Sequence, residues 1–589
     1  MKKEMIMTAA LALGLSACGT AETSTVSTDS GNAGLFTAGT YSVSAAGRNG
    51  DVNVTAVFTS DKIESIDIES EETESIGVTA MEQMKEEILE NQSLAVDAVS
   101  GATLSSNAFM EALSDAVTQA GADPAALGYG EETSKVSDEV EYETEADIIV
   151  VGGGAAGMMA AVAASEEGAS VILLEKSSVL GGNTVCAANG INAADSKVQL
   201  ADETYQSKGA SVEGLEGLQM NNEDARENLV NAFAENSGEV IDWFSDLGVE
   251  FTVNIQDDER NSEQNYYMLQ AEEGGTTALT LVNYLIKAFN DSDVTVYMNM
   301  DAYELVDDNG TITGVIAKDA DGNDVTFTGK AVMLATGGFG KNQELLAEVS
   351  PYLANATTDE VAPTTGEGLL MAEEAGADTV NLDAIQTFPH VIPDYGMILP
   401  MNLPGGFVPD ALYVNNSAER FTAEGFEIPD AILSQDQGEV YCIFDDSGMN
   451  DSLQKLVDSG VISSAESAEE LGEKLGIDGA KLSETITAFN EDIADGTDDA
   501  FGREQNLNSF EGTLYGYRFG VGAHYFMGGV LINEKTQVLD TDGNPINGLY
   551  AAGEVTGGFH GTFRVDGSGL GDSFTFGRIS GKEMAEAVK

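Results

Sequence analysis

Positively charged side chains are scarce in this sequence. Only 26 lysines and arginines stand against 100 aspartates and glutamates, so the formal net charge of the 589 residues is −74. A surface this negative repels nucleic acid and anionic lipid, which makes both poor binding partners. The acidic residues are spread along the whole chain, a pattern typical of a soluble surface in a salty or extracellular setting.

Cysteine is also rare, since the chain has only Cys18, Cys186 and Cys442. Two cysteines in the body of a chain this long do not build a disulfide framework. No Cys-x-x-Cys-His motif and no cysteine set for an iron–sulfur cluster is present. Any redox chemistry must therefore come from an organic cofactor, and no metal site is predicted.

Long apolar runs are missing as well, and no segment has about 18 uninterrupted apolar residues. The N-terminus, MKKEMIMTAALALGLSACGT, has lysines, a short apolar run and small residues, which is typical of a secretory signal. LSAC resembles a bacterial lipobox; an ordinary signal with a chance cysteine is the alternative. We expect a lipoprotein signal peptide over residues 1–17 and a flexible tether over 18–34. The protein would then be exported and anchored to the outer face of the bacterial cell membrane by a lipid on Cys18.

Residues 35–125 have the pattern of a small α+β domain. TYSVSAAG and GDVNVTAVFTSDKIESIDIES alternate as strands do, with turn signals between them. VTAMEQMKEEILEN and SSNAFMEALSDAVTQAG have helical spacing, and the serines of the second can cap its N-terminus. Residues 126–144 read as a charged linker.

A second unit begins with ADIIVVGGGAAGMMAAVAASEEGASVILLEK. A buried strand, a small-residue helix and a second buried strand make this a βαβ unit of the Rossmann type. Gly152, Gly154 and Gly157 follow the first strand, where glycines allow close approach to a pyrophosphate. Glu175 ends the second strand, where a carboxylate can accept hydrogen bonds from ribose hydroxyls. These residues alone leave FAD and NAD both open.

The glycine-rich style of this unit stops at about residue 383 and returns at GAHYFMGG. Between them the chain has loops, helices and scattered aromatic residues. We therefore expect a Rossmann-type domain in two parts, residues 145–382 and 524–589. A capping domain over residues 383–523 interrupts it and can act as a lid.

Several motifs identify the dinucleotide. EKSSVLGGNTVCAANGINAA resembles the flavin-domain signature of the fumarate reductase and succinate dehydrogenase flavoproteins. ATGGFG, TTGEG, HYFMGG, NGLYAAGEVTGGFHG and DSFTFGRISG follow in that family's order, so the resemblance covers about residues 145–589. The layout is most similar to one-chain members such as flavocytochrome fumarate reductases and urocanate reductases. The resemblance implies an α/β Rossmann-type FAD domain interrupted by an α+β lid. The residues it places at a non-covalent FAD are Gly152, Gly154, Ala156, Gly157, Glu175, Asn183, Thr184, Gly190, Gly337, Glu367, Glu554, Ser568 and Leu570.

DAVSGATLSSNAF, residues 97–109, resembles the flavinylation motif of FMN-binding domains. In that family a flavin transferase joins FMN through a phosphodiester to the last hydroxyl residue of the motif, here Thr103. Gly101 and Ala102 leave room for the transferase and the phosphate. The alternative reading is a Ser/Thr cap of the following helix.

Only His390, His524 and His560 carry an imidazole, and all three fall in the lid or the C-terminal flavin segment. His524 in HYFMGG matches the family histidine that binds a substrate carboxylate or carbonyl. Arg564 in HGTFRVDG matches the family arginine that clamps the carboxylate, for which a planar guanidinium is suited. We expect His560 to pack or orient a turn.

The sequence departs from fumarate reductases elsewhere. IQTFPH has Phe388 where the family has a second histidine, and His390 lies two residues further on. The family places its proton-donating arginine after the segment that matches Arg420, but RFTAEGFEIPDAIL contains no later arginine. We therefore expect a substrate other than fumarate and a rebuilt apolar pocket. Its predicted residues are Phe388, His390, Met397, Leu399 and Leu403, with Met401 and Phe407 beside them.

A tyrosine is the plausible replacement for the missing proton donor. Tyr515 matches a tyrosine common in the family, and Tyr395, Tyr413 and Tyr525 are alternatives. Arg518 could lower the pKa of a neighbouring phenol. Core packing is the other explanation for each tyrosine.

These motifs predict an exported, flavin-dependent oxidoreductase of CH–CH groups. It would reduce an activated C=C bond in a 2-enoate or enone, similar to urocanate, acrylate or cinnamate rather than fumarate. Electrons would pass from a membrane quinol or an extracellular donor to covalent FMN, then to FAD and the substrate. The alternatives are a non-catalytic, membrane-anchored electron carrier and a ketosteroid-type dehydrogenase.

Overall fold

The structure is a computed structural model of the chain. It describes residues 35–47, 50–70, 72, 77–96, 99, 103–130, 142–187, 190–253, 266–271, 276–393, 397–398, 411–424, 428–498, 500–503 and 507–589. The expected signal peptide, Cys18 and the tether, together with residues 131–141 of the expected linker, lie outside these residues. Among the described helices, none is long and apolar enough to cross a bilayer.

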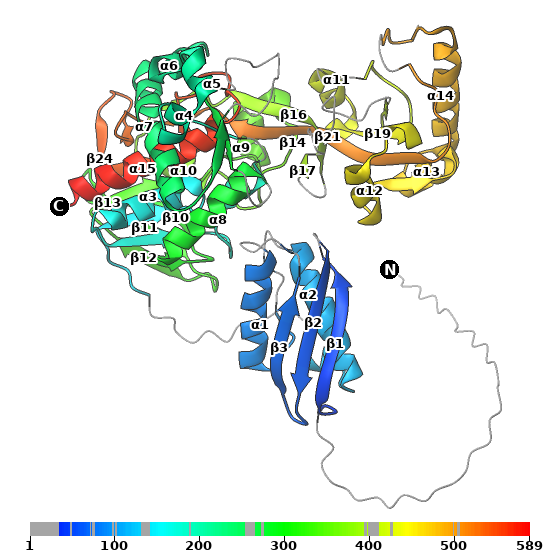
Figure 1. The fold of residues 1–589 in the computed structure, drawn as a ribbon, viewed down its shortest axis with the longest axis horizontal. Helices are drawn as coiled ribbons and strands as arrows, with labels where there is room; N and C mark the ends of the chain where they lie inside the picture. The colour runs from blue at the N-terminus through cyan, green and yellow to red at the C-terminus, as the bar shows by residue number, and fades with distance from the viewer. Residues whose placement is uncertain are drawn as a thin grey trace, which may run out of the picture.

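The N-terminal unit is a three-stranded antiparallel sheet with two helices packed on it (Figure 1). Its strands are β1 (Gly39–Ala46), β2 (Asp51–Phe58) and β3 (Ile63–Glu69), and its helices are α1 (Thr79–Asn91) and α2 (Thr103–Gln119). Alternate residues of β2 are buried because one face of the sheet packs on the helices and the other faces solvent. A 3-10 turn, η2 (Pro124–Leu127), follows α2.

The direction of α2 is fixed by its two ends. The N–H of Thr37, just before β1, donates to the carbonyl of Ala120, just after α2, at 2.6 Å. The other end of α2 lies beside buried Glu72, whose carboxylate accepts from the Ser105 hydroxyl at 2.7 Å. The first residue of α2, Thr103, is therefore at the end of the unit opposite the start of β1. This end faces the rest of the molecule (Figure 1).

The largest unit is built on a six-stranded sheet in the order β23-β24-β13-β4-β5-β9. Five strands are parallel, and β23 pairs antiparallel with β24. The strands are β4 (Ile148–Val151), β5 (Val171–Leu174), β9 (Thr295–Tyr297), β13 (Ala331–Leu334), β23 (Gln537–Leu539) and β24 (Pro545–Ala551). Every residue of β4, β5 and β13 is buried, as expected of a parallel sheet covered on its faces.

Two helices from opposite ends of the sequence pack together in this unit. These are α3 (Ala155–Glu166) and α15 (Ser568–Ala587), which lie side by side in Figure 1. A Cβ on Gly577 would lie 2.6 Å from the Ala156 oxygen, and one on Gly581 would lie 2.3 Å from the Ala160 oxygen. Small residues on α3 and α15 therefore allow the two backbones to approach closely. The other helices here are α4 (Lys197–Ala201), α5 (Glu203–Lys208), α6 (Val212–Met220), α7 (Glu227–Asp246), α8 (Thr277–Asn290), α9 (Gln343–Val349) and α10 (Glu367–Glu374).

Three small sheets complete this unit. They have the orders β10-β11-β12, β6-β8-β7 and β15-β22-β25. Their strands are β6 (Ile191–Asn192), β7 (Phe251–Val253), β8 (Met268–Ala271), β10 (Asp301–Asp307), β11 (Ile312–Lys318), β12 (Asp324–Thr328), β15 (Thr379–Val380), β22 (Gly529–Leu531) and β25 (Thr556–Gly557).

The remaining sheet extends away from the Rossmann-type unit and is organised around β21 (Leu514–Phe526), which is 13 residues long (Figure 1). The first part of β21 pairs with β19 (Glu439–Asp445) and β20 (Ser463–Ala465), and its last part pairs with β14 (Thr357–Thr358) and β16 (Ile385–Ile392). The sheet also contains β17 (Met397–Ile398) and β18 (Leu412–Val414). The helices packed here are α11 (Pro429–Leu433), α12 (Asp451–Asp458), α13 (Ala468–Leu475) and α14 (Gly479–Asp492).

Candidate active site

The turn between β4 and α3 forms an open cradle at a helix N-terminus. A Cβ on Gly157 would lie 1.9 Å from the Gly152 oxygen, so α3 packs directly on the turn. Gly152 has φ +107°, and a Cβ there would lie 2.3 Å from the Ala335 oxygen. Gly154, the N-cap of α3, has no atom within 4 Å of its Cβ position. The space in front of the backbone N–H groups at the N-terminus of α3 is therefore open and fits the pyrophosphate of a dinucleotide. Ala156 is the second residue of this helix.

Glu175 closes one side of this cradle. Its buried carboxylate accepts from the Gly153 and Ser177 N–H groups, both at 2.6 Å. Burial raises the pKa of Glu175, and the two backbone hydrogen bonds oppose that rise. Since each oxygen accepts one bond, each keeps a lone pair that can accept from a ribose hydroxyl.

Glu367 is held beside the same edge of the sheet. Lys176 Nζ donates to Glu367 Oε1 at 2.6 Å and to Thr365 Oγ1 at 2.9 Å. Burial alone would raise the pKa of Glu367, but the hydrogen bonds from Lys176 and Thr365 lower it below its usual value. Lys176 was not among the predicted site residues, although it directly follows Glu175.

A buried acidic pair lies on the other side of the cradle. Asn183 Nδ2 donates to Glu360 Oε1 at 2.9 Å and to Glu554 Oε2 at 3.4 Å, and its oxygen accepts from the Val361 N–H at 2.8 Å. Burial and the Glu554 charge raise the pKa of Glu360 well above its usual value. Thr184 Oγ1 accepts from the Ala155 N–H at 3.3 Å, which brings it to the start of α3. Sequence reasoning missed Glu360.

The N-terminus of α15 carries a second buried polar group. Ser568 Oγ accepts from Asn192 Nδ2 at 2.9 Å and from Gln219 Nε2, and Leu570 is buried next to it in the first turn. Asn192 Oδ1 and Gln219 Oε1 are buried without a hydrogen-bond partner. Unsatisfied buried oxygens of this kind indicate a place for a polar ligand group. Gly190 lies beside β8 and Gly337 beside Thr364, and their Cβ positions are 2.4 Å and 3.0 Å from the nearest atoms.

The C-terminal end of β21 carries the residues predicted to bind substrate. There β21 pairs in parallel with β14, and Thr358 lies opposite Ala523. On its other side β21 pairs antiparallel with β16, and Gln386 lies opposite Tyr525. The pairing with β14 brings Asp359 beside His524, and the pairing with β16 brings Phe388 beside the same imidazole.

His524 and Arg564 lie together at this strand end. His524 Nδ1 is 2.7 Å from Asp359 Oδ2, and His524 Nε2 is 3.4 Å from Arg564 Nη2. The Phe388 ring packs edge-on to the His524 ring, with centroids 4.6 Å apart. The His524 side chain keeps 26% of its surface exposed, so a substrate can reach it.

A second layer fixes the guanidinium of Arg564. Arg564 Nε donates to Gln386 Oε1 at 2.8 Å, and the guanidinium carbon lies 4.6 Å from the centre of the Tyr525 ring. The Tyr525 hydroxyl is 3.1 Å from His560 Nε2 and donates to Asp572 Oδ2 at 3.3 Å. An arginine held on its Nε side and stacked on an aromatic ring can still present its Nη groups to a carboxylate.

Burial dominates the electrostatics of this second layer. It raises the pKa of Tyr525 well above its usual value, and the nearby Asp572 carboxylate adds to that rise. Burial lowers the pKa of His560, although Asp572 opposes the change. His560 Nδ1 and Asp572 Oδ1 are buried and have no hydrogen-bond partner. His560 thus orients Tyr525, which agrees with the structural role expected for it.

The structure does not place Tyr515 at this site. Tyr515 and His524 lie on the same strand nine residues apart, which at about 3.3 Å per residue is about 30 Å. The Tyr515 hydroxyl donates to Asp446 at 3.0 Å, and burial and this bond raise its pKa. Arg518, three residues on, points to the opposite face of the strand and pairs with Glu439 at 3.1 Å. The prediction of Tyr515 as the proton donor, assisted by Arg518, is therefore wrong.

His390 is also away from the predicted pocket. It is buried, with Nδ1 2.8 Å from the Tyr517 hydroxyl and Nε2 2.6 Å from the Tyr413 hydroxyl. Its ring stacks on Phe519 at 4.4 Å. Burial lowers the pKa of His390 to about 3, so the ring is neutral at neutral pH. His390 is a core residue of the outer sheet, and its assignment to the substrate pocket was wrong; the same contacts remove Tyr413 as a proton donor.

The arginines near β18 form buried ion pairs. Arg420 is 2.7 Å from both Glu424 and Asp498, and Arg503 is 3.1 Å from Glu424. All four side chains are at least nine-tenths buried. This supports the structural role that the sequence suggested for Arg420.

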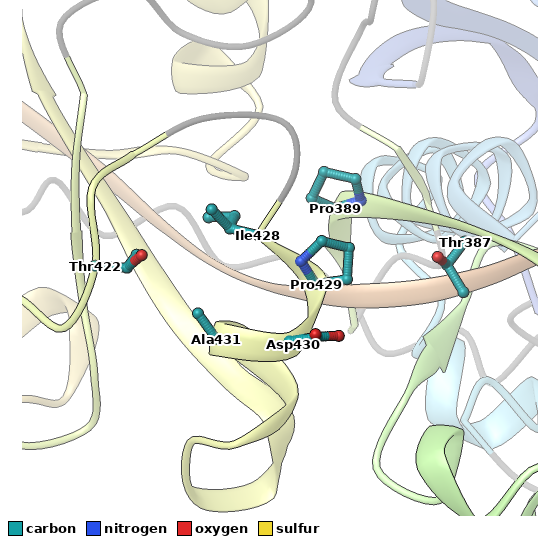
Figure 2. A pocket seen from close by; sticks show the side chains of 7 residues that line it. All are labelled: Thr387, Pro389, Thr422, Ile428, Pro429, Asp430 and Ala431. Carbon is teal, nitrogen blue, oxygen red and sulfur yellow. The ribbon is translucent and has the colours of Figure 1, made fainter. Parts of the chain in front are cut away.

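A pocket of about 390 Å³ lies between β16 and α11 (Figure 2). Thr387 and Pro389 of β16 line one side, and the start of α11 and the residue before it line the other. Neither His524 nor Arg564 lines this pocket. Among the predicted pocket residues, Phe388 contacts His524, and only the backbone of Met397 is described, in β17. Leu399, Met401, Leu403 and Phe407, with Tyr395, lie outside the described residues.

Thr103 is the first residue of α2, and its side chain is not among the described atoms. Gly101 and Ala102 also lie outside them. In the part of the chain that the structure covers, no three His, Cys, Asp or Glu side chains come together as a metal site.

Comparison with protein families gives two matches. Residues 147–570 match the model of the FAD binding domain, and residues 47–118 match that of the FMN-binding domain. The first range lies within the Rossmann-type unit with its inserted sheet, and the second lies within the N-terminal unit and begins just after β1.

Comparison with characterised proteins gives similar relatives. An NADH:acrylate oxidoreductase of Vibrio harveyi is 29% identical over 94% of this chain, and the chain spans 62% of that relative's length. A urocanate reductase of Eggerthella lenta is 32% identical over 92% of this chain and 91% of its own. Among solved structures, the open conformation of a flavocytochrome c3 fumarate reductase superposes with a TM-score of 0.69 at 28% identity, covering 78% of this chain and 84% of the other.

Proposed function

Since the chain belongs to the family of flavoproteins that share the FAD binding domain and also carries an FMN-binding domain, we propose that it is a flavin-dependent reductase of activated C=C bonds. Its proposed substrate is a 2-enoate or enone similar to urocanate, acrylate or cinnamate. The names of the relatives from Vibrio harveyi and Eggerthella lenta support this substrate class.

The observation that carries the proposal is the pair of Arg564 and His524 at the end of β21. Two nitrogen-bearing side chains 3.4 Å apart, both only partly buried, suit one carboxylate or carbonyl. Phe388 packs on His524 where the related fumarate reductases have a second histidine. With the apolar Phe388 ring on one side and Arg564 as the carboxylate-binding residue, the site favours a substrate with one carboxylate over a dicarboxylate.

The chain's own residues define where the cofactors would bind. The cradle at Gly154 and the polar groups of Glu175, Asn183 and Ser568 would hold FAD, and Thr103 would carry FMN. When bound, FAD supplies the hydride for the reduction, and FMN relays electrons to it. Arg564 holds the substrate carboxylate. Its positive charge draws electron density toward the carboxylate and so polarises the adjacent C=C bond.

The proposal includes the partners and location expected from the sequence. A flavin transferase would attach FMN, and a membrane quinol or an extracellular carrier would supply electrons. A lipid on Cys18 would keep the exported protein on the outer face of the cell membrane.

A substrate screen tests the function. The purified protein, co-expressed with its flavin transferase, is assayed with reduced viologen and a panel of urocanate, cinnamates, acrylate, itaconate, fumarate and enones. We expect turnover with at least one monocarboxylic enoate and little with fumarate. Arg564→Ala should then raise KM and lower kcat, because the carboxylate loses its bidentate partner.

The alternative is a non-catalytic electron carrier. The lack of any lysine or arginine from residue 421 to residue 434, where the family has its proton-donating arginine, favours it. Absence of turnover with the whole panel, together with rapid electron transfer to a soluble acceptor, would establish the carrier.

A further inference from the structure

We propose that His524, oriented by Asp359, is the acid that protonates the substrate carbon next to the carboxylate held by Arg564. This inference rests on the proposed function. It assigns the proton donor that replaces the family arginine, and it gives Asp359 a role as the positioning residue of that donor.

The geometry is that of an imidazole held by a carboxylate. Asp359 Oδ2 accepts from His524 Nδ1 at 2.7 Å, so Nδ1 carries a proton, and Nε2 points toward Arg564 Nη2, 3.4 Å away. Asp359 comes directly after β14, whose parallel register with β21 sets this contact. The Phe388 ring against the imidazole removes further rotational freedom. The ring therefore presents Nε2 in one direction only.

The chemistry of enoate reduction puts the proton next to the clamp. The C=C π bond breaks, the carbon β to the carboxylate gains a hydride, which bound reduced FAD would supply, and the carbon α to the carboxylate gains a proton. The α carbon is one bond from the carboxylate that Arg564 holds. His524 Nε2 is 3.4 Å from Arg564 Nη2, so a carboxylate on Arg564 places its α carbon within reach of Nε2. A carboxylate bound to Arg564 takes the Nη2 N–H that otherwise points at Nε2, and its negative charge favours a proton on Nε2. The imidazolium gives this proton to the α carbon and regains one from water, because the side chain is 26% exposed.

The other acids near the site are less suitable. The Tyr525 hydroxyl already faces His560 and Asp572, and its ring lies against Arg564 rather than the open side. Arg420 and Arg503 of the outer sheet are each bound to buried carboxylates. Among the described side chains, His524 is the one that is partly exposed, can carry a proton on Nε2 and contacts Arg564.

Three variants of the full-length holoenzyme test the assignment. Asp359→Asn keeps the size of the side chain but removes its charge, His524→Gln removes the acid, and Tyr525→Phe is the control for the competing acid. With an enoate identified in the screen, we expect Asp359→Asn to lower kcat by about 100-fold or more with KM changed by less than about threefold. Tyr525→Phe keeps the ring that lies against Arg564, so it should lower kcat by much less than Asp359→Asn does. Calorimetric binding of the saturated product carboxylate should stay near the wild-type affinity in Asp359→Asn and be lost in Arg564→Ala.

A nitroalkene probe separates proton transfer from electron transfer. The nitro group is planar like a carboxylate, and reduction at its β carbon gives a nitronate that needs an acid to become a nitroalkane. We expect wild type and Tyr525→Phe to release the nitroalkane, and Asp359→Asn and His524→Gln to release the nitronate, detected by its ultraviolet absorbance.

Nitronate release by Tyr525→Phe instead would identify Tyr525 as the acid and overturn the inference. An Asp359→Asn variant that changes KM alone would also overturn it, because Asp359 would then only shape the binding site. If wild type reduces no member of the enoate panel, the proposed function itself fails. The two failures are thus distinguishable.

Discussion

His390 shows how the surroundings of one imidazole decide its role. From its position two residues after Phe388 it was expected in the substrate pocket, but it lies between the Tyr413 and Tyr517 hydroxyls in a buried core. In this environment the ring cannot carry a charge at neutral pH, since its pKa is lowered to about 3. Its contribution is therefore to the stability of the outer sheet.

This burial makes stability depend on pH. Between an ordinary histidine pKa of about 6.5 and its folded value of about 3, the unfolded state binds one more proton than the native state. The His390 contribution is therefore fully present above pH 6.5 and is lost as the pH falls toward 3. Wild type should lose on the order of 2 kcal/mol more unfolding free energy than His390→Gln between pH 7 and pH 5. Urea titrations of both proteins at the two pH values measure the difference, and equal losses would show that His390 is hydrated in solution.

The Tyr525 hydroxyl is the second residue whose removal has a defined cost. Tyr525→Phe removes the hydroxyl contact to His560 Nε2 and the hydrogen bond to Asp572, both of which are buried residues. The free energy of unfolding should fall by about 1–3 kcal/mol. Thermal unfolding of the wild type and the variant with equal flavin content checks this. No change in Tm would mean that water already reaches these groups.

At the scale of single elements, the turn before α3 allows a paired test of the cofactor site. A Cβ on Gly154 meets no protein atom within 4 Å, whereas one on Gly157 would lie 1.9 Å from the Gly152 oxygen. Gly154→Ala should leave the stability of the flavin-free protein unchanged but abolish FAD binding, because the methyl group fills the pyrophosphate space. Gly157→Ala should lose both FAD and stability. Flavin absorbance and thermal unfolding of the flavin-free proteins measure the two effects, and full FAD content in Gly154→Ala would refute the placement of the pyrophosphate.

The first residue of α2 allows a test of the second flavin. Thr103→Ala should carry no flavin after denaturation when it is co-expressed with the flavin transferase, and Thr103→Ser should still carry it because the hydroxyl is kept. In-gel flavin fluorescence of the denatured proteins distinguishes them. Equal fluorescence in wild type and Thr103→Ala would leave Thr103 only a capping role.

The sequence predicted correctly those helices, strands and turns whose signal is the spacing of residues close together in the chain. The glycines before α3 and the buried strands β4 and β5 follow from short-range rules, and the family models match the same ranges. The contacts of β21 do not follow from such rules. Tyr515 was predicted at the site because it matches a tyrosine common in the family, but the extended strand carries it about 30 Å from His524. Asp359 was missed because only the pairing of β14 with β21 brings it to His524.

For the whole molecule, the net charge of −74 sets the response to salt. Repulsion among carboxylates opposes the compact state, and salt shortens the range of that repulsion. Raising sodium chloride from about 0.01 M to about 0.5 M should increase Tm by at least about 2 °C, the effect of roughly 1 kcal/mol on one unfolding domain of about 150–250 residues. Differential scanning calorimetry with potassium chloride as a second salt checks this, and sucrose of equal osmolality is the control for solute exclusion. A Tm that falls with both salts would indicate that surface ion pairs outweigh the repulsion.

The continuity of β21 has a mechanical consequence. One end of this strand is paired within the outer sheet, and the other end presents His524 and Tyr525 to the site. The outer sheet cannot change its orientation independently of His524, because β21 is one continuous strand that runs through both. Gly520 and Gly522 are the residues at which it can bend with least resistance. A change in the orientation of the outer sheet would therefore change the direction in which the His524 ring points.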